Sequence, residues 1–348
     1  MTEQKLANNQ LDPSGIMQVG LGFWASKTLL AATKLGLFTL LDAGVRTSEQ
    51  IRVSLGLHGQ NLLDFLDALF ALGFLEREGV GPEARYRNTP ETGAFLVKGK
   101  PQYIGGFLEM ANDREYRFWA DLEEGLRTGK PQNEIKTTGK ESFAAIYEDP
   151  ERLRQFTEAM TSVQSGAFVA FAQRFDFSQH HLMVDVGGSG AMLCSLVALH
   201  NPHMRCISYD LPALEPLAKQ TITQFGVESR VEIQSGNFFA EETLPQADLV
   251  TMGNILHSFD LSSKKMLLRK AYNALPVSGE LAVIELILDN ERRRNTMGLL
   301  MSVNMLIESE GGFNFTQADF EHWAKDASFR QVRFEPLAGP TSAAIALK

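Results

Sequence analysis

The apolar and polar positions of the chain follow two different rhythms on either side of about residue 180. Before that point, apolar residues recur at helical spacing, as in the segment from Ile16 to about Ala43. After it, short apolar runs alternate with helical stretches, which is typical of a doubly wound, mostly parallel sheet. The predicted strands are residues 182–186, 205–209, 231–234, 249–252, 280–286, 331–336 and 343–347.

The N-terminal part has the element order of a winged helix. Residues 48–55 and 60–72 are predicted helices, the first capped by Thr47 and the second ended by Gly73. Residues 74–88 then predict a small hairpin, the wing. At the other end of the chain, the last two strands have only a short connection at 339–340, so we expect them to pair antiparallel.

A winged helix raises the alternative of a DNA-binding regulator. The would-be recognition helix carries Asp64 and Asp67 but no Lys or Arg, and Leu, Phe and Ala cover most of its circumference. The whole chain has 42 acidic and 33 basic residues, a net charge of −9, which disfavours nucleic acid as a partner. We expect this helix to be buried, most simply against a partner subunit.

Other classes are disfavoured by what the sequence lacks. No apolar run reaches about 18 residues, so no membrane span is expected. The polar residues 1–10 do not resemble a signal peptide. Only two cysteines occur, Cys194 and Cys206, without the spacing of a metal site, which fits a reducing compartment. We therefore expect a cytoplasmic protein without a metal.

The first candidate for chemistry is the segment MVDVGGSGA, residues 183–191. A strand carrying Asp185 turns through Gly187 and Gly188 into a helix, as in dinucleotide-binding folds, but Leu193 replaces the third glycine of that motif. A carboxylate before the glycines would repel a pyrophosphate and suits a cationic ligand, such as the amino group of S-adenosylmethionine. The alternative is a tight structural turn.

Two further segments follow the second and third strands. Asp210 ends the second strand, where an acid can accept hydrogen bonds from both hydroxyls of a ribose; the alternative role is a helix N-cap. After the third strand, Asn237 and Phe238 can bond the edge and stack on the face of an adenine. The alternative here is aromatic packing within a loop.

A histidine follows the fourth strand. Ligands of such sheets bind beyond the carboxyl ends of the strands, so His257 is well placed to remove a proton from a substrate. Glu285 ends the fifth strand, from which it can orient the imidazole and stabilise its charged form. The alternative is a structural histidine.

These segments, in this order and after a winged helix, resemble the class I small-molecule O-methyltransferases. That family includes plant phenolic and acetylserotonin O-methyltransferases and bacterial natural-product tailoring enzymes, and the resemblance covers about residue 12 to the C-terminus. It implies a Rossmann-like α/β domain, with a seven-stranded, mostly parallel sheet and an antiparallel C-terminal hairpin, after an all-helical winged-helix dimerisation domain. The implied divisions are 12–100 for dimerisation, 101–178 for linker and pocket helices, and 179–348 for catalysis.

The resemblance also implies S-adenosyl-L-methionine as cofactor, a small-molecule substrate and a homodimer. The cofactor would contact Asp185, Gly187, Gly188, Asp210, Leu211, Asn237 and Phe238. His257 would be the general base and Glu285 its partner. The substrate pocket, expected between the two domains, would be walled by Trp119, Met160, Gln164, Met301, Asn304 and Met305.

Four positions depart from the family pattern, namely Ser189, Asn237, Ser258 and Asn314. Asn314 stands where a second acid is usual, with Glu308 or Glu310 as nearby replacements. We expect methylation of a hydroxyl on a small aromatic or hydrophobic metabolite. The departures leave open a relative that binds the cofactor but catalyses hydroxylation, decarboxylation or pericyclic chemistry.

Overall fold

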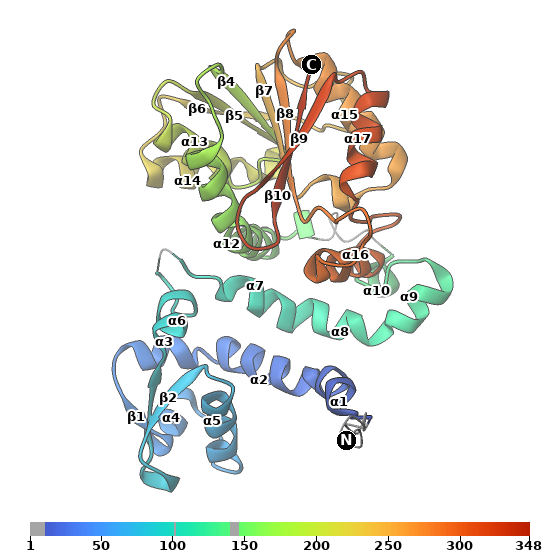
Figure 1. Cartoon of the computed structure of the whole chain (residues 1–348). Helices are drawn as coiled ribbons and strands as arrows, with labels where there is room; N and C mark the ends of the chain where they lie inside the picture. The colour runs from blue at the N-terminus through green and yellow to red at the C-terminus, as the bar shows by residue number, and fades with distance from the viewer. Residues whose placement is uncertain (1–10, 101, 140–145) are drawn as a thin grey trace, which may run out of the picture. The chain divides into compact units, whose positions relative to one another are not determined.

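The computed structural model describes residues 11–100, 102–139 and 146–348 of the chain. It divides into two compact units, Met1–Asp113 and Arg114–Lys348 (Figure 1). The polar segment 1–10 lies outside the described residues. Among the helices of the described ranges, none combines the length and the apolar character that crossing a membrane requires.

The first unit contains the predicted winged helix. The apolar segment after Ile16 forms three helices rather than one, and the chain turns at Gly36, whose φ is 75°. Thr47 caps the next helix in a capping box with Gln50. The elements are α1 (Ser14–Gly20), α2 (Gly22–Lys34), α3 (Leu37–Asp42), β1 (Arg46–Thr47), α4 (Ser48–Leu55), α5 (Leu62–Ala71), β2 (Leu75–Glu78), β3 (Arg85–Asn88), α6 (Pro90–Phe95) and α7 (Gly105–Met110).

This unit is not all-helical. The wing forms as β2 and β3, and the short strand β1 extends it into a three-stranded antiparallel sheet in the order β1-β3-β2. The strand β1 has only two residues, which is too short for a sequence pattern to predict it. It forms because the folded chain places it beside β3.

One face of the helix that the sequence placed against a partner subunit packs within its own unit, while Phe70 and Leu72 near its C-terminal end are exposed. Leu62, Leu66 and Leu69 of α5 belong to the core of the first unit. Five exposed large apolar side chains lie on α1 and α2, and α1 has no buried residue at all. They are Ile16, Met17, Val19, Phe23 and Trp24.

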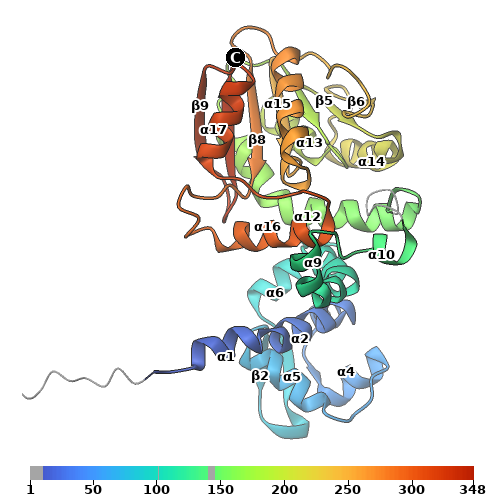
Figure 2. The ribbon, with the colours of Figure 1, turned by 90° about the vertical axis from the view of Figure 1, so that its right-hand side faces the viewer.

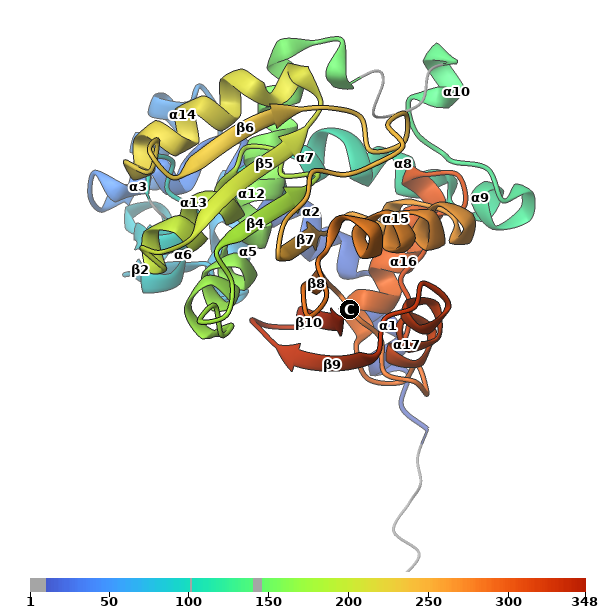
Figure 3. The ribbon, with the colours of Figure 1, turned by 90° about the horizontal axis from the view of Figure 1, so that it is seen from above.

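The second unit is built on a seven-stranded sheet in the order β6-β5-β4-β7-β8-β10-β9, which Figure 3 shows from above. The first five strands run parallel, and β10 pairs antiparallel with both β8 and β9, as predicted. The strands are β4 (Leu182–Val186), β5 (Arg205–Asp210), β6 (Val231–Ser235), β7 (Leu249–Gly253), β8 (Glu280–Glu285), β9 (Gln331–Pro336) and β10 (Ser342–Leu347).

Helices cover both faces of this sheet. One face packs on helices α12 and α13, and the other on α15 and α17, which lie side by side in Figure 2. The helices are α8 (Tyr116–Phe118), α9 (Leu122–Thr128), α10 (Ile135–Thr138), α12 (Pro150–Arg174), α13 (Met192–His200), α14 (Glu215–Phe225), α15 (Leu261–Ala274), α16 (Thr296–Glu308) and α17 (Gln317–Asp326).

The alternation of side chains along the central strands fills two separate cores. Met183 of β4 joins the core under α12 and α13, whereas its neighbours Val184 and Val186 join the core under α15 and α17. The chain runs outward from β4 through β5 to β6 and then crosses to β7, on the other side of β4. The carboxyl ends of β4 and β7 therefore form the switch point at which such sheets bind ligands.

Candidate functional site

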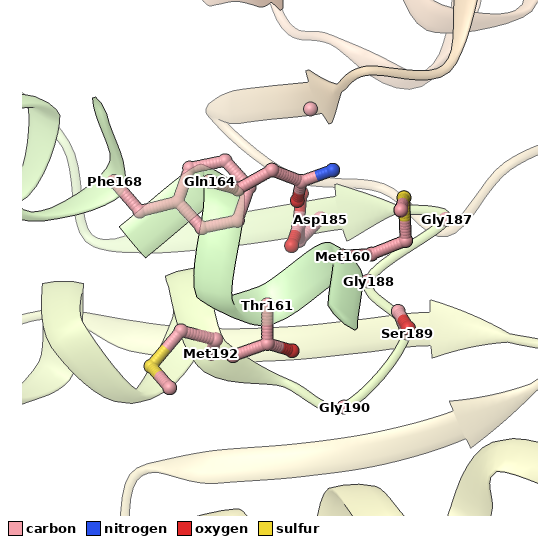
Figure 4. Close-up of a pocket in the computed structure, with 11 residues that line it drawn as sticks. Met160, Thr161, Gln164, Phe168, Asp185, Gly187, Gly188, Ser189, Gly190 and Met192 are labelled. Carbon is pink, nitrogen blue, oxygen red and sulfur yellow. The ribbon is translucent and has the colours of Figure 1, made fainter. Parts of the chain in front are cut away.

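A pocket lies at the carboxyl end of β4, where the sequence placed the glycine turn. Its lining combines Asp185 and the turn 187–190 with Met160 and Gln164 from α12 (Figure 4). The structure thus brings two residues predicted for the substrate wall against the predicted cofactor turn. Thr161, Phe168, Met192 and Gly253 complete the lining.

Gly187 and Gly188 of the turn pack too closely against neighbouring groups to carry a side chain. Gly187 has φ 75°, and a Cβ there would lie 2.9 Å from Cγ1 of Ile255. At Gly188 a Cβ would lie 3.1 Å from the carbonyl oxygen of Asp185 and would collide with Ser208. The turn therefore requires glycine at both positions, because Ile255, Ser208 and the Asp185 carbonyl occupy the space that a Cβ would need.

Two non-glycine residues of the turn adopt left-handed conformations. Ser189 has φ 47° and Ala191 has φ 58°, and the latter is the N-cap of α13. A left-handed residue with a Cβ costs on the order of 1 kcal/mol relative to glycine. The Ser189 departure is thus accommodated by the same backbone that glycine would adopt, at a small cost in strain.

Asp185 is a buried acid that, among the described residues, has one hydrogen-bond donor from a side chain. It is 3% exposed, and Thr251 donates to its Oδ1 over 2.7 Å. Burial raises the pKa of Asp185 to about 7, the Thr251 hydroxyl lowers it, and the charge of Asp210 raises it further. A carboxylate with so little compensation favours the arrival of a cation.

Asp210 fixes the glycine turn to the end of β5. Its Oδ2 accepts from the backbone N–H of Ser189 over 2.8 Å, and its Oδ1 accepts from that of Leu211 over 2.7 Å. Burial raises the pKa of Asp210, while these two backbone bonds lower it. Each oxygen keeps a lone pair for a further donor, such as a ribose hydroxyl. Leu211 follows in extended backbone, half-buried.

The loop after β6 carries Asn237 and Phe238. The Oδ1 of Asn237 accepts from the backbone N–H of Phe239 over 2.9 Å, so this oxygen serves its own turn and the amide nitrogen is the group left for an adenine. Phe238 is half-buried and packs edge-on to Phe259, 6.0 Å between ring centroids. The position of a Cβ on Gly187 would lie 4.0 Å from the Phe238 ring, which places that ring beside the glycine turn.

His257 and Glu285 meet at the carboxyl ends of β7 and β8. His257 sits in a 3₁₀ turn, Leu256–Ser258, and its Nδ1 lies 2.6 Å from Oε2 of Glu285. The backbone N–H of His257 also donates to Oε1 of Glu285 over 3.2 Å. The Glu285 side chain is 1% exposed, so the carboxylate has little water and holds His257 by one bond to the imidazole and one to the backbone.

The remaining predicted wall residues lie on or against α16. The indole Nε1 of Trp119 donates to Oδ1 of Asn304 over 2.7 Å. Met305 is buried and Met301 is half-buried on the same helix. Helix α16 packs against the 3₁₀ turn that carries His257, but these four residues do not belong to the lining of the pocket at β4.

The expected substitutes for the second family acid are engaged elsewhere or exposed. Glu308 pairs with Arg114, 3.0 Å from its guanidinium, and Glu310 is exposed. Asn314 itself is buried, and its Nδ2 donates to the carbonyl of Leu286 over 3.1 Å. Its Oδ1 has no hydrogen-bond partner within the described residues. The position has thus lost its charge and kept one unsatisfied acceptor.

Sequence reasoning missed several residues that the fold brings to this site. Thr161 and Phe168 share one face of α12 with Met160 and Gln164, and their three- and four-residue spacing is the signal that would have found them. Thr251 was treated only as part of a strand. Tyr147 has its pKa raised by burial and by the charge of Asp210, a proximity that no sequence pattern indicates.

The described ranges contain no group of three or more His, Cys, Asp or Glu side chains placed to hold a metal ion. The polar groups at the pocket are instead the glycine backbone and the carboxylate of Asp185, with the carboxylate of Asp210 bonded to the same turn. Such a set suits an organic cation with hydroxyl groups better than a metal.

Known proteins provide an independent comparison. A model of the O-methyltransferase domain matches residues 119–330, and a model of the O-methyltransferase dimerisation domain matches residues 17–98. The first match falls on the unit that contains the seven-stranded sheet, and the second falls on the winged-helix unit.

Individual relatives match along nearly the full length. The tetracenomycin polyketide synthesis 8-O-methyl transferase of Streptomyces glaucescens is 36% identical over 97% of each chain. The N,N-dimethyltransferase OxyT of Streptomyces rimosus is 36% identical over 79% of this chain and 78% of its own. The crystal structure of human N-acetylserotonin methyltransferase in complex with S-adenosylmethionine has a TM-score of 0.89 at 28% identity, covering 98% of this chain and 99% of that one. The chain therefore belongs to the O-methyltransferase family whose members carry this dimerisation domain.

Proposed function

We propose that this enzyme methylates a hydroxyl group of a small aromatic metabolite of the polyketide type, with His257 as the general base. The methyl donor of this O-methyltransferase is S-adenosyl-L-methionine, which supplies a methyl group on a positively charged sulfur. The single observation that carries the proposal is the bond between His257 Nδ1 and Glu285 Oε2, 2.6 Å long, at the carboxyl end of the sheet.

The residues at β4 and β5 fit this cofactor. Asp185 is a buried, poorly compensated carboxylate that an amino group would neutralise, and Asp210 has lone pairs left for two hydroxyls. Gly187 and Gly188 have no side chain of their own to cover the backbone of the turn. We assign the methionine part to this turn, the ribose to Asp210 with Leu211, and the adenine to Asn237 and Phe238.

The geometry of the pair at β7 and β8 assigns the protons. Because Glu285 accepts from Nδ1, the neutral ring carries its hydrogen there and presents Nε2 as an acceptor. Nε2 would take the proton from the substrate hydroxyl, and Glu285 would stabilise the resulting imidazolium. The bound cofactor would supply the methyl group, whose bond to sulfur would break as its bond to the substrate oxygen forms, with S-adenosylhomocysteine as the leaving group. A phenol has a pKa near 10, so removal of its proton is needed at neutral pH.

The substrate class rests on the wall and on the relatives. Met160, Met301 and Met305 are flexible apolar side chains that adapt to a flat ring system. Trp119, held by Asn304, adds an aromatic surface of fixed orientation. The relative from Streptomyces glaucescens is named for 8-O-methylation in polyketide synthesis, which supports an aromatic polyketide hydroxyl as acceptor.

One observation favours a second candidate, a family member that binds the cofactor without transferring methyl groups. Asn314 leaves a buried unsatisfied oxygen where the family usually has an acid, so the surroundings of the base are altered. Release of S-adenosylhomocysteine with a panel of naphthols and hydroxyanthraquinones separates the candidates. Product without S-adenosylhomocysteine release favours the second.

We also propose that the protein is a cytoplasmic homodimer. The dimerisation domain and the exposed apolar side chains of α1 and α2 support a second copy of the chain as the cover of that surface. The two buried free cysteines fit a reducing compartment. A single monomeric mass in light scattering at micromolar concentration would contradict the dimer.

The role of His257 is tested by the variant His257→Gln. Its turnover should fall by about 10²–10⁴-fold, the usual contribution of a general base, while calorimetric binding of S-adenosylhomocysteine stays unchanged. The matched control is His322→Gln, because His322 is exposed on α17, where it lies 3.6 Å from Asp326. Near-full turnover of His257→Gln excludes the base role.

A further inference from the structure

A fully buried lysine lies next to the catalytic pair. Lys264 is 0% exposed and belongs to the first turn of α15, after the N-cap Asp260. A cation in the first turn opposes the helix dipole, whose positive end is at the N-terminus. Burial costs it further, so a neutral side chain of the same volume would be more stable at this position.

The ammonium of Lys264 joins two segments that meet at His257. Its Nζ donates to the carbonyl of Phe259, two residues after His257, and lies 3.5 Å from the centre of the Phe313 ring. The residue before Phe313 packs directly on the histidine, since a Cβ on Gly312 would lie 2.9 Å from the His257 carbonyl oxygen. The Lys264 side chain therefore contacts both segments, the backbone after His257 and the ring that follows Gly312.

The charged groups that act on Lys264 lie around the same histidine. Glu285 on β8 and Asp260 at the N-cap of α15 both interact electrostatically with Lys264. Burial lowers the pKa of Lys264 to about 8, and these two carboxylates act in the opposite direction. The lysine is thus still predominantly charged at neutral pH, which its placement over an aromatic ring also favours.

We propose that Lys264 is a positioning residue for the reaction: its ammonium fixes the backbone that follows His257 and offsets the charge of Glu285, so that the imidazole stays neutral and ready to accept a proton. Glu285, almost fully buried and 2.6 Å from Nδ1, favours a positive charge on the ring. A nearby cation opposes that protonation. This inference rests on the proposed role of His257 as the base.

The test is the titration of His257 by NMR in full-length protein saturated with S-adenosylhomocysteine and labelled at histidine Cε1. His257→Gln identifies the resonance. In Lys264→Met, which keeps the volume and removes the charge, the pKa of His257 should rise by about 1. Lys265→Met is the matched control, because Lys265 is the next residue on α15 and pairs with Asp326 at the surface over 2.9 Å; it should leave His257 unchanged.

A second variant keeps the inference testable if Lys264→Met does not fold. Phe313→Leu removes the ring that holds the ammonium and should raise the pKa of His257 in the same direction, by less. The inference is overturned if His257 titrates within about 0.2 of the native value in the folded variants, or if Lys265→Met moves it as far. The titration does not need methyl transfer. A negative result would therefore overturn the inference about Lys264 without bearing on the proposed activity.

Discussion

Replacing Asp185 with asparagine should make the ligand-free protein more stable and weaken binding of the cofactor. The native carboxylate is buried beside the glycine turn, with Thr251 as its side-chain donor. Asparagine has nearly the same shape, and its Oδ1 can accept from the same hydroxyl. The variant therefore removes a buried charge without opening a cavity.

The magnitude follows from the pKa of this group. Burial raises the pKa of Asp185 from 3.8 to about 7, which corresponds to about 4 kcal/mol at 1.36 kcal/mol per unit. For a raised pKa, the favourable contribution to stability is complete below pH 3.8 and is lost as the pH rises through 7. An asparagine side chain does not titrate, so the stability of Asp185→Asn relative to the native protein should increase by about 2–3 kcal/mol between pH 5 and pH 8.

The assay is thermal unfolding between pH 5 and pH 8 on protein stripped of bound cofactor. At about 2–4 °C per kcal/mol for a domain of this size, the gap between variant and native Tm should widen by several degrees toward pH 8. Calorimetry should in parallel show at least a tenfold loss of affinity for S-adenosylhomocysteine, because the amino group loses a charged partner.

A second acid on the same sheet provides the control. Asp248 accepts from the backbone N–H groups of His181 and Leu182, over 2.9 and 3.2 Å, at the opposite end of β4. Asp248→Asn should destabilise the protein and leave cofactor affinity intact. A pH-independent Tm gap for Asp185→Asn, or unchanged binding of S-adenosylhomocysteine, would refute the reasoning.

Two further predictions concern the turn and the far end of the sheet. Gly188→Ala should abolish binding of S-adenosylhomocysteine in calorimetry, because the new Cβ would lie 3.1 Å from the carbonyl oxygen of Asp185 and collide with Ser208; micromolar binding would show that the turn adapts. Burial raises the pKa of Glu280, but bonds from His180 and Arg333 outweigh it and lower that pKa from 4.5 to about 2. Glu280→Gln should therefore destabilise the protein by about 2 kcal/mol at pH 7 in urea unfolding, after allowance for screening by solvent. That contribution is present above pH 4.5 and is lost as the pH falls through 2, so an equal deficit at pH 3 and pH 7 would contradict it.

Local patterns predicted most of the sheet. Every predicted strand appears within two residues of its observed bounds. The central strands β4, β7 and β8 are buried on both faces, so each is a short apolar run that its own sequence defines. The antiparallel end of the sheet followed from the length of one connection. The strand β1 could not be predicted, since two residues have no period and pair only when β3 lies beside them.

The candidate site was predictable to the extent that it sits at strand ends. Asp185, Asp210, His257 and Glu285 each close a strand or follow one, and parallel strands bring such ends to one edge. The residues predicted for the substrate wall lie in two groups. Met160 and Gln164 face the glycine turn, whereas Trp119 and Asn304 bond each other beside α16.

The sequence by itself determined the class of the protein, the order of its strands along the chain and the residue types of its site, because periodicity and motifs are properties of neighbouring residues. The tertiary structure decided which charges share a low-dielectric environment. It set Lys264 beside Glu285, Asp185 within the influence of Asp210, and one face of α5 in the core of its own unit. These relations join residues that lie far apart in the chain, and the strength of each depends on distance and burial, which exist only once the chain has folded.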